Sequence, residues 1–331
     1  MNAADNLIKK KSGITNLTKK YGILILVVLA MILCTLLSDT FLTKSNIFNV
    51  LKQVSVIIIL AYGEFMLIVS GGIDLSAGAV VAATGTMSVI VYNTTGSLIL
   101  AILTSLAMGF FAGAVNGFFV TKFLLPPFMV TLGMQIFMRG AALWFCNSTP
   151  VPVEGETFKI LGQGELLGVP NLLYLIFILL LLFVFIMNRT AFGRYLYAIG
   201  GNKDAAQASG IKVNKVIFLA YAWAGLLSGL GGFSIMSRLN SGTPTVGSTG
   251  VTYEFDAIIG IILGGTSMAG GNGSVLYSVL GCIFIGILNN ALNLLNVQTY
   301  YQQIVKGLLI IIAITFDAIS KGNGIKLFKK R

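Results

Sequence analysis

The chain has 331 residues, of which 56% are hydrophobic and only 10% are charged, and its mean hydropathy is +0.90. This composition leaves no stretch for a soluble domain and indicates a membrane protein. The net charge of +11 lies next to apolar runs, as in loops that face anionic lipid, which argues against nucleic acid as a partner. The chain contains no histidine, which argues against a His-based hydrolytic enzyme or zinc site.

The apolar runs predict about ten transmembrane helices, because a helix needs roughly 20 residues to cross a hydrocarbon core about 30 Å thick. The predicted spans are 21–38, 50–69, 75–92, 98–120, 126–146, 171–187, 216–236, 254–268, 274–295 and 301–318. The run from Leu51 to Tyr92 must be divided at Gly71 and Gly72, since one helix of that length would extend for about 63 Å. The first run has a basic flank but no signal-peptidase site, so we expect an uncleaved anchor. The predicted fold is an all-α polytopic membrane protein with a single transmembrane domain over 1–331.

The distribution of lysine and arginine predicts the orientation, because these residues accumulate on the cytoplasmic side near the spans. With both termini inside, few basic residues fall in external segments, and these are Lys44, Lys52, Lys159 and Arg238. We therefore expect a cytoplasmic N-terminal tail (1–20), an external loop (147–170), a cytoplasmic loop (188–215) and a cytoplasmic basic tail (319–331).

Two spans are expected to be interrupted. Glu254 and Asp256 open a span whose apolar part ends at Gly264 after too few residues to cross a membrane, so it predicts a half-length helix packed inside protein. An acid (Glu64), a short apolar run and a glycine pair recur around Gly71. This recurrence suggests two structurally related halves, one in spans two to five and the other in spans seven to ten.

Acidic residues at membrane depth suggest functional sites. Asp74 follows the glycine pair and either caps the next helix or contacts substrate, with the cap favoured. Glu64 is either a proton carrier or the partner of a cation on another helix, for which Lys306 and Arg139 are the candidates.

Other sequence features limit the kinds of functional site that the chain can contain. Cys34, Cys146 and Cys282 stand alone in apolar runs and are expected to be small hydrophobic residues. No metal site is predicted. The chain lacks G-x-x-x-x-G-K-[ST], so any ATP that drives transport must be bound by a separate polypeptide.

Glycines recur at helix-packing spacing, as in Gly109, Gly113 and Gly117 and in Gly225 and Gly229. Small residues let helices approach closely in lipid, so we expect most of them to pack helices within the chain. One such face is a candidate contact for a second subunit.

Several runs resemble the permeases of bacterial ABC importers for ribose, xylose and galactose. The runs are Ser70-Gly-Gly-Ile-Asp-Leu-Ser-Ala-Gly78, Phe192-Gly-Arg-Tyr-Leu-Tyr-Ala-Ile-Gly-Gly-Asn-Lys-Asp-Ala-Ala-Gln-Ala-Ser-Gly-Ile211, Tyr253-Glu-Phe-Asp-Ala-Ile258, Leu263-Gly-Gly-Thr-Ser-Met-Ala-Gly-Gly-Asn-Gly273 and Leu288-Asn-Asn-Ala-Leu-Asn-Leu-Leu295. They occur in the family's order over nearly the whole chain, and the end of the chain looks most like the ribose branch. Phe255 stands where the family commonly has Leu, and Asn272 where it frequently has a basic residue.

The resemblance implies a transport subunit in the bacterial inner membrane that is not itself an enzyme. It implies as partners a second permease copy, an extracytoplasmic sugar-binding protein and a cytoplasmic cassette ATPase that binds the ATP and Mg. This ATPase is either a dimer or, as we expect, one chain with two cassettes. This chain would bind no cofactor. The external loop 147–170 is then the candidate docking surface for the binding protein, with a solvated connector as the alternative.

The loop 188–215 is the candidate for coupling to the ATPase, with an ordinary basic connector as the alternative. Its sequence predicts a short helix with Asn202 as N-cap and Gly210 as C′ residue. The residues assigned to coupling are Gly193, Arg194, Gly200, Gly201, Asn202, Asp204, Ala205, Ala206, Ser209 and Gly210. The candidates for the pathway or gate are Gly71, Gly72, Asp74, Ser76, Asn116, Asn289 and Asn290, with helix–helix hydrogen bonding as the alternative role.

Two other functions stay open at this point. One is an ATP-independent secondary sugar carrier or channel in which Glu64 or Asp74 carries protons. The other is a structural membrane scaffold, which fits poorly with broken spans and buried acids.

Overall fold

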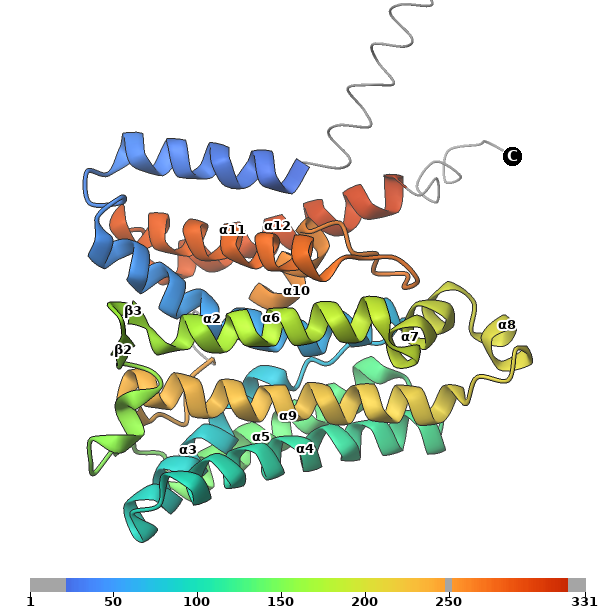
Figure 1. The fold of residues 1–331 in the computed structure, drawn as a ribbon, viewed down its shortest axis with the longest axis horizontal. Helices are drawn as coiled ribbons and strands as arrows, with labels where there is room; N and C mark the ends of the chain where they lie inside the picture. The colour runs from blue at the N-terminus through green and yellow to red at the C-terminus, as the bar shows by residue number, and fades with distance from the viewer. Residues whose placement is uncertain (1–21, 248–251, 321–331) are drawn as a thin grey trace, which may run out of the picture.

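The structure is a computed structural model that describes residues 22–247 and 252–320. Within these ranges every predicted span contains one helix, and most helix axes run roughly along the long axis of the molecule (Figure 1). The helices of the spans are Gly22–Leu37, α2 (Lys44–Val69), α3 (Ala77–Thr95), α4 (Leu98–Lys122), α5 (Pro127–Phe145), α6 (Asn171–Arg189), α9 (Val213–Leu239), α10 (Tyr253–Leu263), α11 (Val275–Leu294) and α12 (Thr299–Ser320). Of the described helices, 7 are long and apolar enough to cross a membrane by themselves, which confirms an all-α polytopic membrane protein. The expected tails at 1–20 and 321–331 lie outside the described residues.

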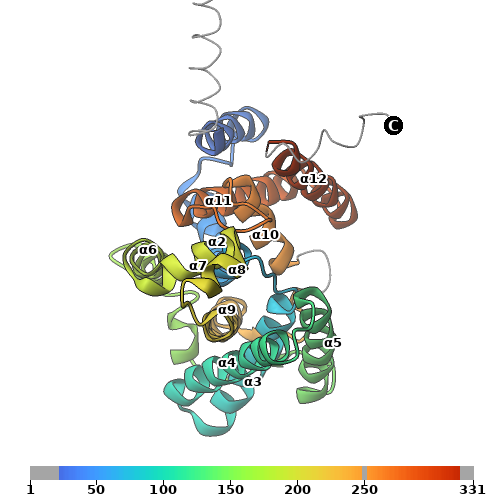
Figure 2. The same cartoon turned by 90° about the vertical axis from the view of Figure 1, so that its right-hand side faces the viewer.

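Helices α2 and α9 form the centre of the bundle. Figure 2 looks along the helices and shows α2 between α11 and α9, with α6 to one side. Every residue of α2 from Val54 to Val69 is buried, and the sequence of this helix is apolar on all sides, as expected of a helix enclosed by others. By contrast, α5 and α6 expose large apolar side chains such as Phe137 and Phe177, which suits a surface in contact with lipid.

The two halves predicted from the sequence share one packing pattern. In the first half, α3 packs against α4 and α5; in the second, α10 packs against α11 and α12. Across the halves, α9 contacts both α3 and α4, and α2 contacts both α10 and α11. Exchanging α2 to α5 for α9 to α12 therefore reproduces these contacts, although the packing of α4 against α5 has no counterpart of similar extent between α11 and α12 among the described residues.

Glycines bring α4 and α9 together along their backbones. A Cβ added at Gly109 or Gly113 of α4 would overlap backbone atoms of Gly225 on α9, and one added at Gly225 would overlap Gly109. This confirms close packing within the chain. It also shows that the glycine face of α4 is occupied by α9, whereas the suggestion that one glycine face meets a second subunit stays a prediction.

Both predicted interruptions are present. α10 has only 11 residues, which cover about 16 Å, roughly half of the hydrocarbon core. Its C-cap is Gly264, and Gly265 follows in the left-handed region with φ +82°. Gly71, after α2, has φ +84°, a backbone conformation that favours glycine.

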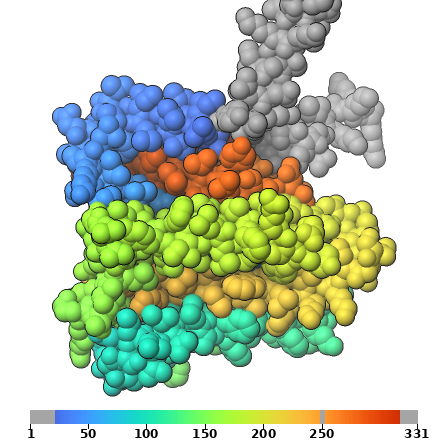
Figure 3. Space-filling model, in the orientation of Figure 1, coloured from blue at the N-terminus to red at the C-terminus, as the bar shows by residue number. Residues whose placement is uncertain are grey.

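The two ends of the bundle differ. At one end, short antiparallel strands β1 (Val151–Pro152) and β4 (Ser241–Gly242) pair, and a 3₁₀ helix (Thr157–Ile160) precedes the hairpin of β2 (Glu165–Leu166) and β3 (Val169–Pro170). At the other end, α7 (Ala191–Gly201) and α8 (Lys203–Ala208) extend beyond α6, and Figure 3 shows this segment standing out in yellow. The helix Gly22–Leu37 begins, and α12 ends, toward the side of α7 (Figure 1).

Candidate functional site

A buried polar cluster surrounds the break between α2 and α3. The Asp74 N–H donates to Oε2 of Glu64 at 3.3 Å, and Oδ1 of Asp74 accepts from the backbone N–H of Ser76 at 2.7 Å. From α4, Nδ2 of Asn116 donates to Oγ of Ser76 at 3.0 Å and lies 3.4 Å from Oδ2 of Asp74. The structure therefore brings together the candidates Asp74, Ser76 and Asn116, all of them buried, and adds Glu64.

Glycine is required where the chain turns into this cluster. Gly71 adopts its left-handed conformation in open space, whereas a Cβ on Gly72 would lie 3.1 Å from the hydroxyl of Tyr221 on α9. That hydroxyl donates to the carbonyl oxygen of Ile73 at 3.1 Å. Asp74 lies two residues before the N-cap Ser76 and bonds Ser76 itself, so it fixes the turn into α3 instead of capping the helix.

A second cluster forms where α10 begins. Oε1 of Glu254 accepts from Nε2 of Gln135 at 3.1 Å and lies 3.7 Å from Nη2 of Arg139, both on α5. The Glu254 carboxylate also rests against Gly78 in the first turn of α3, where a Cβ would overlap it. Glu254 thus connects the start of α10 to the start of α3, next to the cluster around Asp74.

Asp256, two residues after Glu254, contacts polar side chains of α12 and α11. The ammonium of Lys306 lies 2.9 Å from its Oδ1, and Nδ2 of Asn289 donates to its Oδ2 at 3.1 Å. The suggestion that Lys306 or Arg139 pairs with Glu64 was wrong, because these cations reach Asp256 and Glu254 instead. Both acids could be singled out from the sequence, since they open a helix too short to span the membrane.

Asn289 and Asn290 serve different contacts although they are adjacent. Asn290 exchanges hydrogen bonds with Asn46 of α2, at 2.8 Å and 3.0 Å between the two side-chain amides. Neither asparagine joins the cluster around Asp74. This pair ties α11 to the first turn of α2.

Several oxygen atoms in these clusters have no hydrogen-bond partner among the described residues. They are buried and belong to the side chains of Glu64 (Oε1), Asn116 (Oδ1), Glu254 (Oε2) and Asn289 (Oδ1). Buried polar groups are almost always paired, and leaving one unpaired costs about 1–3 kcal/mol. Chemically, these oxygens are acceptors for the hydroxyl groups of a polar solute.

The loop 188–215 folds into two helices. Gly193 is buried against the end of α6, where its N–H donates to Oγ1 of the N-cap Thr190 at 3.3 Å, and Arg194 is exposed. Gly200 packs against Val69 of α2, whereas Gly201 is exposed with open space around it.

The predicted caps of α8 are confirmed. Oδ1 of Asn202 accepts from the Ala205 N–H at 2.9 Å, and Gly210 has φ +84°. The N–H groups of Gly210 and Ile211 donate to the carbonyls of Gln207 and Ala206, the pattern of a Schellman motif. Asp204, in the first turn, and the C-cap Ser209 are exposed, and Ala206 is the buried residue of this helix.

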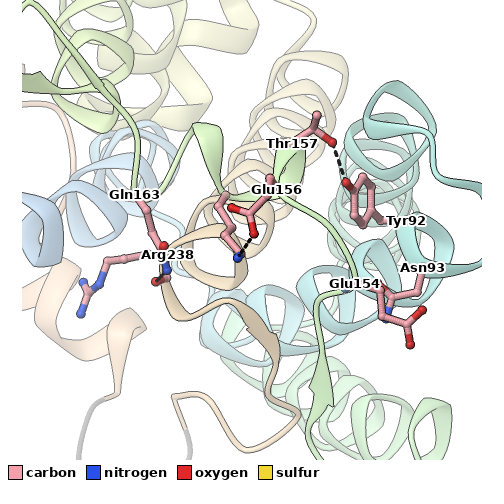
Figure 4. Close-up of polar contacts among 8 residues, drawn as sticks. Tyr92, Asn93, Glu154, Glu156, Thr157, Gln163 and Arg238 are labelled. Carbon is pink, nitrogen blue, oxygen red and sulfur yellow. Dashed lines mark hydrogen bonds and ion pairs between the residues drawn. The ribbon is translucent and has the colours of Figure 1, made fainter.

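The loop 147–170 is fixed to α3 and α9 by polar contacts (Figure 4). Asn93 donates to the Pro152 carbonyl at 2.8 Å and accepts from the Glu154 N–H at 3.0 Å. Lys159 pairs with Glu156 at 2.7 Å, and Lys52 pairs with Glu165 at 3.5 Å. Of the three acids in the loop, Glu154 alone has a carboxylate outside an ion pair among the described residues.

The fold and its buried polar groups define a multi-pass membrane protein with two interrupted helices. Comparison of the sequence with protein families then places residues 46–314 in the family described as "Branched-chain amino acid transport system / permease component", and the chain belongs to this family. It is a transport subunit of the permease type.

Named relatives cover almost the whole chain. The chain is 40% identical over 305 residues to the ribose import permease protein RbsC of Escherichia coli K12, covering 91% of this chain and 94% of that protein. It is 37% identical over 311 residues to the ribose import permease protein RbsC of Bacillus subtilis, covering 93% and 96%. The L-arabinose transport system permease protein AraH of Escherichia coli K12 is 33% identical over 298 residues, covering 90% of each chain. No solved structure matches the chain.

Proposed function

We propose that this chain is the transmembrane permease of a binding-protein-dependent ABC importer for a monosaccharide, with ribose as the first candidate. Support comes from the ribose import permeases that it resembles over more than nine-tenths of its length. The L-arabinose permease among its relatives widens the candidate class to pentoses.

The observation that carries the proposal is the set of buried oxygens without partners beside the first helix break and at the start of α10. Interrupted helices are found at membrane depth where they line a cavity or are covered by protein. We assign the sugar path to Asp74, Ser76 and Asn116 together with Glu64 and Glu254. All of these side chains are buried, so the path is closed in this conformation.

The proposed coupling element is α8 with the end of α7. Its capped helix is exposed at the end of the bundle and leaves room for a cytoplasmic cassette ATPase, which would bind ATP and Mg. The complex would contain two permease copies and two cassettes in one ATPase chain. This chain would bind no cofactor of its own.

The proposed orientation places α8 and both termini in the cytoplasm of a bacterial cell, with the chain in the inner membrane. The start of the helix Gly22–Leu37 and the end of α12 point toward the side of α7, which supports this orientation (Figure 1). The loop 147–170 would then face outward and receive the sugar-binding protein.

The test is purification of the tagged chain from its native host in mild detergent, with mass spectrometry of the proteins that copurify. We expect a cassette ATPase whose hydrolysis of Mg-ATP rises when the sugar-binding protein and ribose are added. If the chain purifies alone and uptake of ribose collapses with the proton gradient but survives vanadate, the importer is refuted. A secondary carrier that uses Glu64, a buried carboxylate with no cation beside it among the described contacts, then replaces it.

A further inference from the structure

Three segments that are far apart in the sequence meet near the end of the bundle at which α7 lies. Gly200, in the last turn of α7, packs against the carbonyl of Val69 and the backbone nitrogen of Gly271, and a Cβ at Gly200 would overlap both. The N–H of Gly271 donates to the same Val69 carbonyl at 2.8 Å. We call Val69, Gly200, Gly270 and Gly271 the glycine junction.

The geometry of the junction requires glycine. Gly270 and Gly271 have φ values of +85° and +74°, which L side chains rarely adopt. A Cβ on Gly270 would lie 2.9 Å from the Cα of Gly200. The three segments therefore touch through backbone atoms, with no side chain between them that could change rotamer and absorb a displacement.

The junction lies between the proposed coupling helix and both helix breaks. On one side, Gly200 is followed by Gly201 and by Asn202, the N-cap of α8. On the other side, Val69 precedes the break at Gly71.

The turn at Gly270 and Gly271 belongs to the break that follows α10. A second bond holds α7 to this break, because the Tyr197 hydroxyl donates to the Gly273 carbonyl at 3.0 Å. The cluster around Asp74 follows the first break, and Glu254 and Asp256 open the helix that the second break ends.

We propose that the glycine junction transmits the movement of α8 to both helix breaks, with Gly200 as the positioning residue. The proposal rests on the function proposed above. A displacement of α7 by the ATPase moves Val69 and the turn at Gly270 together, since both contact Gly200. The two halves of the permease are thereby driven by one coupling helix.

The test compares two glycines. Gly200→Ala places a methyl group into the junction, whereas Gly140→Ala on α5 places the same group where nothing lies within 4 Å and outside the proposed coupling element. Each variant complex is purified from the native host and reconstituted in vesicles with its binding protein, and labelled ribose taken up per ATP hydrolysed is measured. We expect this ratio to fall about tenfold for Gly200→Ala, within the usual range of coupling between sites, and to stay at the wild-type value for Gly140→Ala.

Tyr197→Phe tests the same connection without added volume. It removes the bond to Gly273, and we expect ribose per ATP to fall about fivefold, as loss of one hydrogen bond implies. If the Gly200→Ala complex does not assemble, the ratio of ribose to ATP measured for Tyr197→Phe tests the glycine junction by itself. A purely structural defect would lower the yield of complex and leave the ratio unchanged.

The outcomes separate the two proposals. A working wild-type importer in which Tyr197→Phe and any assembled Gly200→Ala complex keep the normal ratio would overturn the junction alone. A wild-type chain that copurifies with no cassette ATPase would overturn the importer and the junction with it.

Discussion

The ammonium of Lys306 on α12 lies 2.9 Å from Oδ1 and 3.0 Å from Oδ2 of Asp256 on α10, and both side chains are buried. This ion pair anchors the half-length helix to the last span. From α11, Nδ2 of Asn289 donates a hydrogen bond to Oδ2 of the same carboxylate. The start of α10 is thus held by two helices of its own half.

Removing the cation should destabilise the protein strongly. Lys306→Met leaves the Asp256 carboxylate buried without its partner, a change that costs about 3–5 kcal/mol. We expect a large drop in the thermal unfolding temperature in detergent, followed by fluorescence-detected size exclusion. The double variant Lys306→Met with Asp256→Asn should recover most of the loss, and a wild-type melting temperature for the single variant would contradict the assignment.

Packing between α4 and α9 should tolerate no added methyl group. Gly225→Ala would overlap the backbone of α4 at Gly109 and should cost about 1–3 kcal/mol, as overpacking usually does. Gly140→Ala on α5 is the control, because nothing lies within 4 Å of that position. Equal melting temperatures for the two variants would show that the contact is loose.

Asn116 should affect transport more than stability. Asn116→Ala removes the amide beside Asp74 and Ser76, and we expect ribose uptake to fall about tenfold, which corresponds to 1.4 kcal/mol. Ser105→Ala on the same helix loses a bond of 2.7 Å to the Gly229 carbonyl and should leave uptake near normal. Uptake is compared at matched amounts of complex, and equal uptake in both variants would remove Asn116 from the path.

The cap of α8 should control communication with the ATPase. Asn202→Ala loses the acceptor for the Ala205 N–H, a change worth about 1 kcal/mol to the helix, whereas Asn202→Asp keeps an acceptor there. We expect weaker binding-protein stimulation of ATP hydrolysis in the alanine variant and near-normal stimulation in the aspartate variant. Ala206→Glu should abolish the stimulation, because Ala206 is the buried residue of α8.

Glu154 should take part in docking the binding protein. Its carboxylate is exposed and unpaired among the described contacts, whereas Glu156 is held by Lys159. Glu154→Gln should raise the concentration of binding protein needed for half-maximal stimulation, and added salt should shrink the difference from wild type. Glu156→Gln serves as the control, and a larger effect there would reverse the assignment.

Much of the fold followed from local sequence features. Apolar runs located the spans, because backbone groups in lipid must be satisfied within helices. The glycine pair at Gly71 and the acids before Gly264 located both breaks, and the caps at Asn202 and Gly210 defined α8. Each of these signals depends on residues close together in the chain.

The contacts between helices could not be predicted in the same way. From the sequence, Lys306 and Arg139 were the candidate partners of Glu64. In the structure they pair with Asp256 and Glu254 of α10, because α10 lies between α12, which carries Lys306, and α5, which carries Arg139. Likewise, the spacing of Gly109 and Gly113 indicated a packing face without indicating that α9 fills it. The glycine junction depends on three distant segments and had no local signal.

The contact between α4 and α9 also bears on how such a protein can change over evolutionary time. Where two backbones touch, nearly every substitution adds atoms for which there is no space, so this part of the chain has little freedom to drift. In the proposed importer, we therefore expect adaptation to a new sugar at side chains of the proposed path, such as Asn116, whose exchange would not move the main chain. Natural selection can alter the side chains of the proposed path while the backbone contact between α4 and α9 stays unchanged.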